Sequence, residues 1–324
     1  MNSPRIIVTR RLPAPVEQDV VARYGAVLNA DDHQFTRDEL SAAMRESDIV
    51  LCTLTDDLSR PTLDAARGGR ARLLANFGVG FNHIDLAAAK ELGLAVTNTP
   101  GVLTEDTADH TLLLILAVAR RAGEGERELR AGRWTGWRPT HLLGSRVSGK
   151  TLGIIGFGRI GRAVAARAHN GFGMKVVYHS RTPADSATER ATGAVRCDSL
   201  ENLLHQSDFV SLHCPATPET RHLINEARLR QMPPHAYLVN TSRGDVVDER
   251  ALVAALDGKW IAGAALDVYD GEPRVNPQLL DRENVVLLPH LGSATIESRV
   301  AMGRRAIANI DAFVSQRPLP DRIA

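Results

Sequence analysis

The sequence has few cysteines and no excess of either charge. Its three cysteines, Cys52, Cys197 and Cys214, are widely separated in 324 residues, and the formal net charge is +1. An odd, dispersed set of cysteines argues against a disulfide framework and favours a reducing compartment. A balanced charge without a basic stripe argues against nucleic-acid binding. We therefore expect a cytoplasmic protein that does not bind nucleic acid.

Long apolar runs and metal-binding motifs are also missing. The longest apolar run, Leu112–Ala119, ends at Arg120 and is too short to cross a bilayer. The segment Met1–Arg10 contains no long apolar stretch, so we expect no secretory signal. The chain has no H-E-x-x-H, no paired C-x-x-C and no G-x-S-x-G. These absences argue against membrane insertion, a metal site and a Ser–His nucleophile.

Short apolar runs alternate with helical patterns along the whole chain. Many runs are continuous in Val, Ile and Leu, which is typical of strands buried on both faces. Helical patterns between such strands indicate βαβ units and parallel sheets, so the predicted fold class is α/β. The expected strands are Ile6–Val8, Ile49–Leu51, Leu73–Asn76, Ala95–Val96, Thr151–Ile155, Lys175–Tyr178, Phe209–His213, Ala236–Asn240, Ala262–Val268 and Val285–Leu288.

Two clusters of turn-forming residues divide the chain into domains. Asn98–Gly101 precedes one long helical pattern, and Pro289–Gly292 precedes the last one. We therefore predict an outer domain made of residues 1–100 and 290–324. A central domain, residues 101–289, is inserted into it.

The segment 156–161 has the pattern G-x-G-x-x-G. It follows the apolar run Thr151–Ile155, opens a helix with an apolar stripe and leads to the expected strand Lys175–Tyr178. This context is typical of a dinucleotide-binding loop, in which glycines allow a tight turn, approach of the pyrophosphate and close helix packing. The alternative is a glycine-rich turn without a ligand. The expected cofactor contacts here are Gly156, Phe157, Gly158, Arg159, Ile160 and Gly161.

The end of the next expected strand bears on the choice of cofactor. NAD-selective folds carry Asp or Glu there, to accept from the ribose hydroxyls. This chain has Ser180, Arg181 and Thr182 instead. All three can donate to a 2′-phosphate, which a carboxylate would repel. We therefore predict a preference for NADPH, with NAD as the alternative cofactor; a solvated surface role for Arg181 stays open.

The order of these and further motifs resembles the D-isomer-specific 2-hydroxyacid dehydrogenase family, and within it the glyoxylate/hydroxypyruvate reductases. The resemblance implies a flavodoxin-like substrate domain and an inserted, doubly wound NAD(P)-binding domain. It also implies a cleft between the two Rossmann-like domains and a homodimer, with a dimerisation segment at about residues 101–148. The motifs that carry it, besides 156–161, are Asn76–Asp85, Asn98–Thr104, Asn240–Gly244, Ala265–Tyr269, Gly271–Pro273 and Pro289–Thr295.

Reduction of a 2-oxo acid requires a cation for the carboxylate and an acid for the developing alkoxide. Arg243 follows an apolar strand, and its planar guanidinium matches a carboxylate in a bidentate manner. A structural salt bridge is the alternative role. His290 follows another strand, and histidine is the residue type suited to proton transfer near working pH, so we predict that His290 is the general acid. His83 and His213 are the competing histidines.

Other site residues follow from the resemblance. Glu272 is expected to hydrogen-bond His290 and favour the imidazolium, as a triad acid does, unless it is a solvated loop carboxylate. Val79 and Gly80 resemble the loop whose N–H groups bind the substrate carboxylate. Asp267 resembles the residue that holds the nicotinamide carboxamide. Further cofactor contacts are expected at His213, Cys214, Pro215 and Thr241.

Two of the three tryptophans lie in one segment with poor helical pattern, Gly132–Pro139. In the reductases that this chain resembles, a similar segment crosses the dimer and places a tryptophan at the neighbour's cleft. By that resemblance Trp137 narrows the substrate site, with Trp134 as the second choice. Local packing beneath a loop is the alternative.

The sequence therefore predicts an NADPH-preferring reductase of small 2-oxo acids, such as glyoxylate or hydroxypyruvate. One alternative is another member of the family, acting on phosphoglycerate, lactate or formate. A second alternative is a cofactor-sensing binding protein, similar to the co-repressors of this family, because some co-repressors keep the same three catalytic residues.

Overall fold

The computed structural model describes residues 3–324. It divides into two compact units, the first made of residues up to Leu103 together with Ala294–Ala324, and the second of Thr104–Ser293. Both divisions fall a few residues beyond the turn-forming clusters on which the sequence-based boundaries rest. Among the described residues, no helix is both long and apolar enough to cross a membrane.

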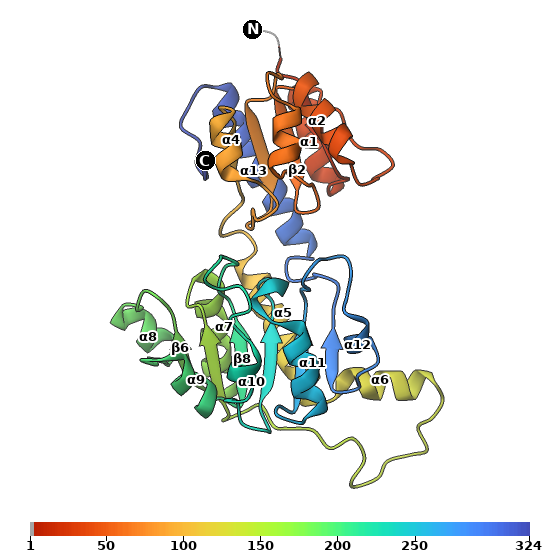
Figure 1. The fold of residues 1–324 in the computed structure, drawn as a ribbon, viewed down its shortest axis with the longest axis vertical. Coiled ribbons are helices and arrows are strands. Elements are labelled where there is room, and N and C mark those ends of the chain that lie inside the picture. Colours follow the sequence, from red (N-terminus) through yellow and green to blue (C-terminus); the bar gives the residue numbers. More distant parts are fainter. Residues whose placement is uncertain (1–2) are drawn as a thin grey trace. The chain divides into compact units, whose positions relative to one another are not determined.

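The first unit is a four-stranded parallel sheet in the order β1-β2-β3-β4 (Figure 1). Its strands are β1 (Ile6–Val8), β2 (Ile49–Thr53), β3 (Leu73–Phe77) and β4 (Ala95–Thr97). Its helices are α1 (Ala14–Tyr24), α2 (Arg37–Glu46), α3 (Arg60–Ala65), α4 (Leu86–Glu91) and α13 (Ile296–Val314).

Both faces of this sheet are covered. Ile49 and Leu51 of β2 belong to the core beneath α1 and α13, whereas Val50 and Cys52 belong to the core beneath α2, α3 and α4. Because neighbouring residues of a strand point to opposite faces, burial of both faces requires a continuous apolar run. The end of the chain returns to the same sheet, where the N–H of Ile323 donates to the carbonyl of Val96 at 2.8 Å.

The second unit is a seven-stranded parallel sheet in the order β11-β10-β9-β8-β5-β6-β7. Its strands are β5 (Thr151–Ile155), β6 (Lys175–His179), β7 (Ala194–Arg196), β8 (Phe209–Leu212), β9 (Tyr237–Asn240), β10 (Gly263–Leu266) and β11 (Val285–Leu287). Its helices are α5 (Thr104–Ala119), α6 (Ala122–Arg130), α7 (Arg159–Phe172), α8 (Ser186–Thr192), α9 (Leu200–Gln206), α10 (Glu226–Leu229), η1 (Gly244–Val246), α11 (Glu249–Asp257) and α12 (Pro277–Leu280).

This sheet is doubly wound. Ile154 of β5 lies in the core with α5 and α7, and Ile155 lies in the opposite core with α9 and α11. Two parallel α/β sheets confirm the predicted fold class.

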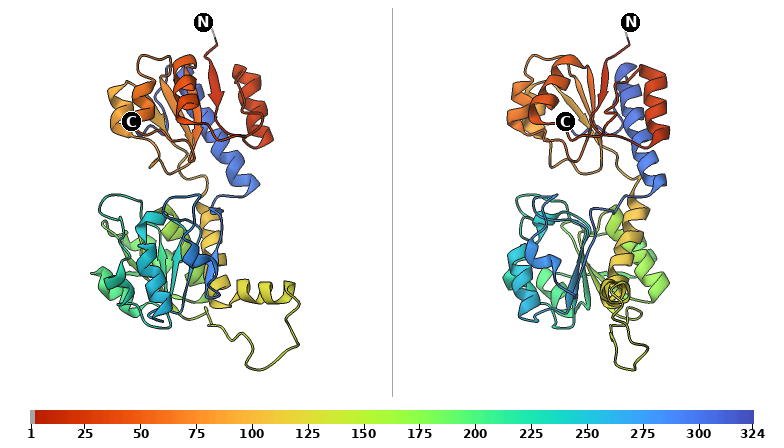
Figure 2. Two further views of the ribbon diagram at one scale, coloured as in Figure 1. Left: turned by 45° about the vertical axis from the view of Figure 1, so that its right-hand side comes forward. Right: turned by 90° about the vertical axis from the view of Figure 1, so that its right-hand side faces the viewer.

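Helix α6 and the loop after it stand away from the rest of the second unit (Figure 2). No residue of α6 is buried. Trp137, in the following loop, is 82 % exposed, and Trp134 is 52 % exposed. The sequence did not predict α6, because a helix that faces no core needs no apolar periodicity.

Candidate active site

The predicted site residues of the second unit follow parallel strands at one edge of its sheet. Gly156 follows β5, His213 follows β8, Thr241 follows β9, Asp267 follows β10 and His290 comes soon after β11. Strands β5 and β8 are neighbours, but the chain runs outward from them in opposite directions. Ligands of open α/β sheets bind at such a switch point, outside the carboxyl ends of the strands.

The glycine loop after β5 has the shape that a dinucleotide requires. Gly156 has φ +91°, and an added Cβ would lie 2.5 Å from the backbone nitrogen of Cys214. A Cβ at Gly161 would overlap the carbonyl of Gly156, whereas a Cβ at Gly158 would meet nothing within 4 Å. Gly158 begins α7 without a side-chain cap. Glycine is thus required by packing at Gly156 and Gly161, and open space over a helix N-terminus fits a pyrophosphate.

The side chains between these glycines anchor the loop. Phe157 is buried and stacks on Tyr178 with ring centroids 4.0 Å apart. Ile160 packs against the same core, and Arg159 is exposed. The loop therefore offers a ligand its backbone and Arg159, while Phe157 and Ile160 hold it against the sheet.

The end of β6 carries a donor-rich turn. Ser180 Oγ donates to the carbonyl of Thr182 at 2.5 Å, and the side chains of Arg181 and Thr182 are exposed. A hydrogen bond from Thr217 lowers the pKa of Glu219, and the nearby charge of Arg181 lowers it further. Arg181 is exposed, so its guanidinium is accessible to an anionic ligand.

Cys214 is buried and His213 is half-buried, and both side chains stay neutral. Burial lowers the pKa of His213 to about 3, and its Nε2 lies 2.8 Å from Ser211 Oγ. Burial raises the pKa of the Cys214 thiol to about 11. A histidine with so low a pKa holds no proton to donate near neutral pH, so His213 is unsuited to the role of general acid. Pro215 follows at the surface.

Glu272 and His290 are in contact. His290 Nδ1 lies 2.7 Å from Glu272 Oε2, and the N–H of Tyr269 donates to Glu272 Oε1 at 3.0 Å. Burial raises the pKa of Glu272, but these hydrogen bonds and the charge of Arg243 outweigh it, so the net pKa lies below the usual value. Glu272 is therefore a carboxylate that fixes the imidazole through one nitrogen and leaves the other free for chemistry.

Asp267 holds the turn that carries His290. Its backbone carbonyl accepts from the N–H of His290 at 2.9 Å. Its carboxylate accepts from the N–H groups of Leu291 at 2.7 Å and Gly292 at 2.8 Å. His290 has φ +54°, which a residue with a side chain adopts only when its surroundings hold it. Asp267 thus positions the turn that carries His290, a role in addition to the cofactor contact that the sequence predicted.

Arg243 lies in the turn after β9, next to the loop that carries Glu272. An added Cβ at Gly244 would overlap the backbone of Tyr269, so glycine lets the two loops approach closely. Burial lowers the pKa of Arg243, and the negative charges of Glu272 and Asp245 offset only part of this effect. A guanidinium still keeps its charge at neutral pH. Its Nη1 donates to the carbonyl of Ser242 at 2.5 Å.

Known proteins are similar to this chain over nearly its whole length. The family model described as "D-isomer specific 2-hydroxyacid dehydrogenase, NAD binding domain" matches residues 112–292. The chain belongs to this family. Glyoxylate reductase of Thermococcus litoralis is 44 % identical over 324 residues, covering 99 % of this chain and 96 % of the relative.

Two solved structures of the family extend the comparison. The holo form of Rhodotorula graminis D-mandelate dehydrogenase has a TM-score of 0.88 at 31 % identity, covering 100 % of this chain and 98 % of that one. An NADPH-dependent glyoxylate/hydroxypyruvate reductase from Sinorhizobium meliloti, in complex with NADP and malonate, has a TM-score of 0.87 at 34 % identity, covering 99 % and 97 %. This chain is thus an NAD(P)-dependent oxidoreductase, as the sequence predicted.

The structure adds three residues that the sequence did not single out, all on one face of α5. Thr107 Oγ1 donates to the carbonyl of Gly292 at 3.0 Å, and His110 Nε2 lies 3.0 Å from Asp267 Oδ1. Thr111 Oγ1 lies 3.0 Å from Thr241 Oγ1. Polar residues at i, i+3 and i+4 that lead into the apolar run Leu112–Ala119 were the available signal.

The remaining predicted residues lie elsewhere. Val79 and Gly80 are in the first unit, in the loop after β3. Trp134 and Trp137 are in the segment that follows α6 and are exposed. The second unit therefore contains Arg243, the contact between Glu272 and His290, and the glycine loop. The roles of the two loop residues and the two tryptophans stay proposals.

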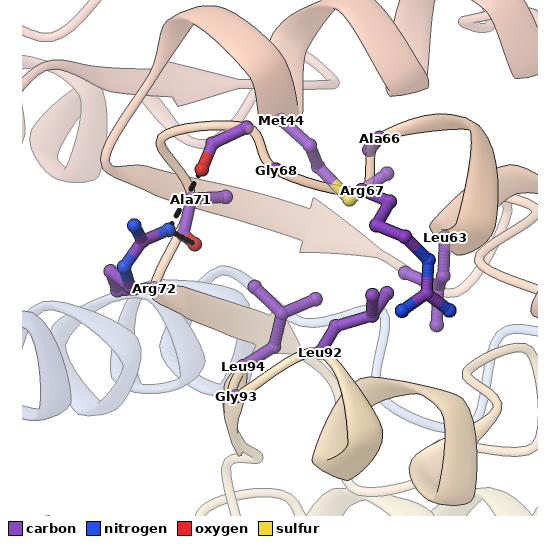
Figure 3. Close-up of a pocket in the computed structure, with 11 residues that line it drawn as sticks. Met44, Leu63, Ala66, Arg67, Gly68, Ala71, Arg72, Leu92, Gly93 and Leu94 are labelled. Atoms are coloured by element: carbon purple, nitrogen blue, oxygen red, sulfur yellow. Dashed lines mark hydrogen bonds between the residues drawn. The ribbon is translucent and has the colours of Figure 1, made fainter.

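One cavity lies away from the site. It measures about 280 Å³ and is at the amino ends of β3 and β4, with Met44, Leu63 and Leu94 in its apolar lining (Figure 3). Arg72 Nη1 donates to the carbonyls of Gly69 and Ala71 at its rim. This edge is opposite to the one where ligands of such sheets bind.

Proposed function

We propose that this protein reduces small 2-oxo acids, such as glyoxylate and hydroxypyruvate, to 2-hydroxy acids, in the D form where the product is chiral. The observation that carries the proposal is the 2.7 Å contact between Glu272 and His290 in the unit that also holds Arg243 and the glycine loop. A held acid and a nearby cation are what the reaction requires. The names of the related glyoxylate reductases support this substrate class.

In this proposal Arg243 binds the substrate carboxylate through its planar guanidinium. His290 in its imidazolium form gives the Nε2 proton to the carbonyl oxygen on C2 as C2 is reduced, while Glu272 holds Nδ1. A bound nicotinamide supplies the hydride that C2 gains. His290 is left neutral and takes a proton from solvent before the next turnover; in the direction of oxidation the same nitrogen acts as the base.

The proposal includes a preference for NADPH, with NADH as the weaker cofactor. Ser180, Arg181 and Thr182 stand where NAD-selective folds carry an acid. The exposed guanidinium of Arg181 supports recognition of a 2′-phosphate by a charge-assisted hydrogen bond.

The proposal also includes a homodimer in which Trp137 of one subunit narrows the substrate site of the other. Leu129, Trp134, Trp137 and Leu143 are all more than half exposed on a protruding segment. Large apolar side chains gathered on such a segment are typical of protein interfaces, where tryptophan is a frequent anchor.

The test is a panel of 2-oxo acids assayed by loss of NADPH or NADH absorbance. We expect the highest kcat/KM for glyoxylate or hydroxypyruvate with NADPH, and a lower value for phenylglyoxylate, the oxidised form of mandelate. A preference for phenylglyoxylate would favour a mandelate-type enzyme. Cofactor binding without turnover of any acid would favour the sensing protein.

A further inference from the structure

Two buried asparagines of the first unit hold the loop after β3. Asn76 Nδ2 donates to the carbonyls of Gly78 at 3.1 Å and Gly80 at 2.8 Å. Asn98 Nδ2 donates to the carbonyl of Val79 at 2.8 Å. Asn76 is 0 % exposed and Asn98 8 % exposed. Three consecutive carbonyls of the loop are therefore held by side chains from the interior.

This arrangement fixes the direction of the loop's N–H groups. The peptide bonds of the loop are trans, and in a trans peptide the N–H points away from the carbonyl of the same unit. The N–H groups of Val79, Gly80 and Phe81 share peptide units with the three held carbonyls. Each of them therefore points away from the asparagine that holds its own peptide unit, in the loop at the carboxyl end of β3. Consecutive N–H groups that face outward form a concavity for anions.

Asparagine is suited to this task in a way that aspartate is not. Its amide donates two hydrogen bonds and has no charge. A carboxylate of the same shape would oppose its oxygens to the loop carbonyls and place a negative charge beneath the concavity. Gly78 also has a packing reason to lack a side chain, because an added Cβ would lie 2.8 Å from Leu54 Cδ2.

We propose that Asn76 and Asn98 are positioning residues for the substrate carboxylate, and that the N–H of Phe81 is a third donor to it beside those of Val79 and Gly80. The inference rests on the proposed function for the identity of the anion. The side-chain amides of both asparagines donate to carbonyls of the loop. Their removal should therefore weaken binding of the acid and spare both the cofactor and the proton transfer in the other unit.

The experiment uses the full-length protein with Asn76→Asp and Asn98→Asp, and the dicarboxylate oxalate as the probe. We expect each variant to raise the KM for glyoxylate and the Kd of oxalate by about ten- to a hundredfold, the range for losing a hydrogen bond to a charged group. The Kd of NADPH and kcat at saturation should stay within about threefold of wild type.

Asn29→Asp is the matched control. Asn29 is a buried asparagine of the same unit whose Nδ2 donates to the carbonyls of Thr9 and His33 at 2.8 and 2.7 Å. It should leave oxalate binding unchanged. An equal loss in Asn29→Asp would show that any such change disturbs the whole unit, which would overturn the inference. Wild-type KM and oxalate affinity in folded Asn98→Asp would overturn it as well, even if Asn76→Asp fails to fold.

The test of the two positioning asparagines is separable from the test of the proposed function. If wild type reduces 2-oxo acids but the variants bind oxalate normally, the proposed function is supported and the positioning role is wrong. If wild type binds oxalate without turnover and the variants lose that binding, the positioning role is supported and the proposed function is wrong. Absence of oxalate binding by wild type would overturn the anion site itself.

Discussion

The loop after β3 and the loop after β5 both place closely spaced glycines at the carboxyl end of a parallel strand, but different groups hold them. Side-chain amides of Asn76 and Asn98 hold the first loop by its carbonyls. Backbone packing holds the second, with Gly156 against Cys214. The first loop ends in an irregular turn, whereas the second opens the helix α7.

This difference separates recognition from chemistry. Both loops offer N–H groups to an anion, which needs no titratable side chain. Only the second unit adds the contact between Glu272 and His290 and the cation of Arg243. Changes to the loop of the first unit should therefore act on KM, whereas changes to His290, Glu272 or the glycine loop of the second unit should act on kcat or on cofactor binding.

The largest effect is expected for His290→Ala in the second unit. We expect kcat for glyoxylate reduction to fall by about 10² to 10⁴, because general acid catalysis is lost. The Kd of NADPH should not change. His235→Ala is the control, since His235 lies 3.0 Å from Asp208 at the opposite edge of the same sheet. A nearly normal kcat in folded His290→Ala would remove His290 from the mechanism.

A pair of glycine variants tests how the second loop is held. In Gly158→Ala the new Cβ meets nothing in the protein, so the melting temperature should stay and the Kd of NADPH should rise by at least about tenfold. In Gly156→Ala the positive φ and the contact with Cys214 should lower the free energy of unfolding by about 1 to 3 kcal/mol. Equal melting temperatures for the two variants would contradict this account.

Glu272→Gln sharpens the role of the carboxylate. The pKa of Glu272 lies below its usual value, so the side chain is ionised at neutral pH and favours the imidazolium. Without that charge, the acid form of His290 is lost at lower pH. We expect kcat to fall by about tenfold and the upper pH limit of reduction to move down. An unchanged pH profile of kcat would indicate a purely structural contact.

Arg181→Ala tests cofactor choice within the second unit. Loss of a charge-assisted hydrogen bond should lower kcat/KM for NADPH by about tenfold. The value for NADH should change little, because NADH lacks the 2′-phosphate. Equal losses with both cofactors would show that Arg181 does not recognise that group.

The smallest expected effect is that of Trp137→Ala. If a partner subunit's indole narrows the site, its removal should raise kcat/KM for phenylpyruvate relative to glyoxylate by about three- to tenfold. Trp134→Ala tests the second choice on the same segment, and it should leave the ratio unchanged if Trp137 is the residue that narrows the site. An unchanged ratio in a dimer of normal size would leave Trp137 with an interface role alone.

Much of the fold could be predicted from the sequence because both sheets are covered on two faces. The predicted strand Ile49–Leu51 lies within β2, and the predicted strand Thr151–Ile155 coincides with β5. Helix α6 and strand β7 were not predicted. Two of the three residues of β7 are exposed, so their pattern contains no core signal.

Residues of the candidate site that have a chemical role of their own could be predicted from their sequence motifs. Glu272 and His290 are 18 positions apart in sequence, and the structure brings them into contact. Groups that act through others were not predictable, since Asn76, Asn98 and His110 show their partners only in three dimensions. Asp267 illustrates the limit, because its hydrogen bonds to Leu291 and Gly292 depend on how β10 and β11 pair.

Direct hydride transfer from the cofactor to the substrate is tested by following the label from NADPH deuterated at C4 of the nicotinamide. The labelled cofactor is reacted with glyoxylate and wild-type protein, and the glycolate is analysed by mass spectrometry and NMR. We expect deuterium on C2 of the glycolate. When unlabelled NADPH is used in heavy water, we expect no carbon-bound deuterium in the glycolate. Glycolate without label from the cofactor, or with carbon-bound deuterium from the solvent, would contradict direct hydride transfer at this site.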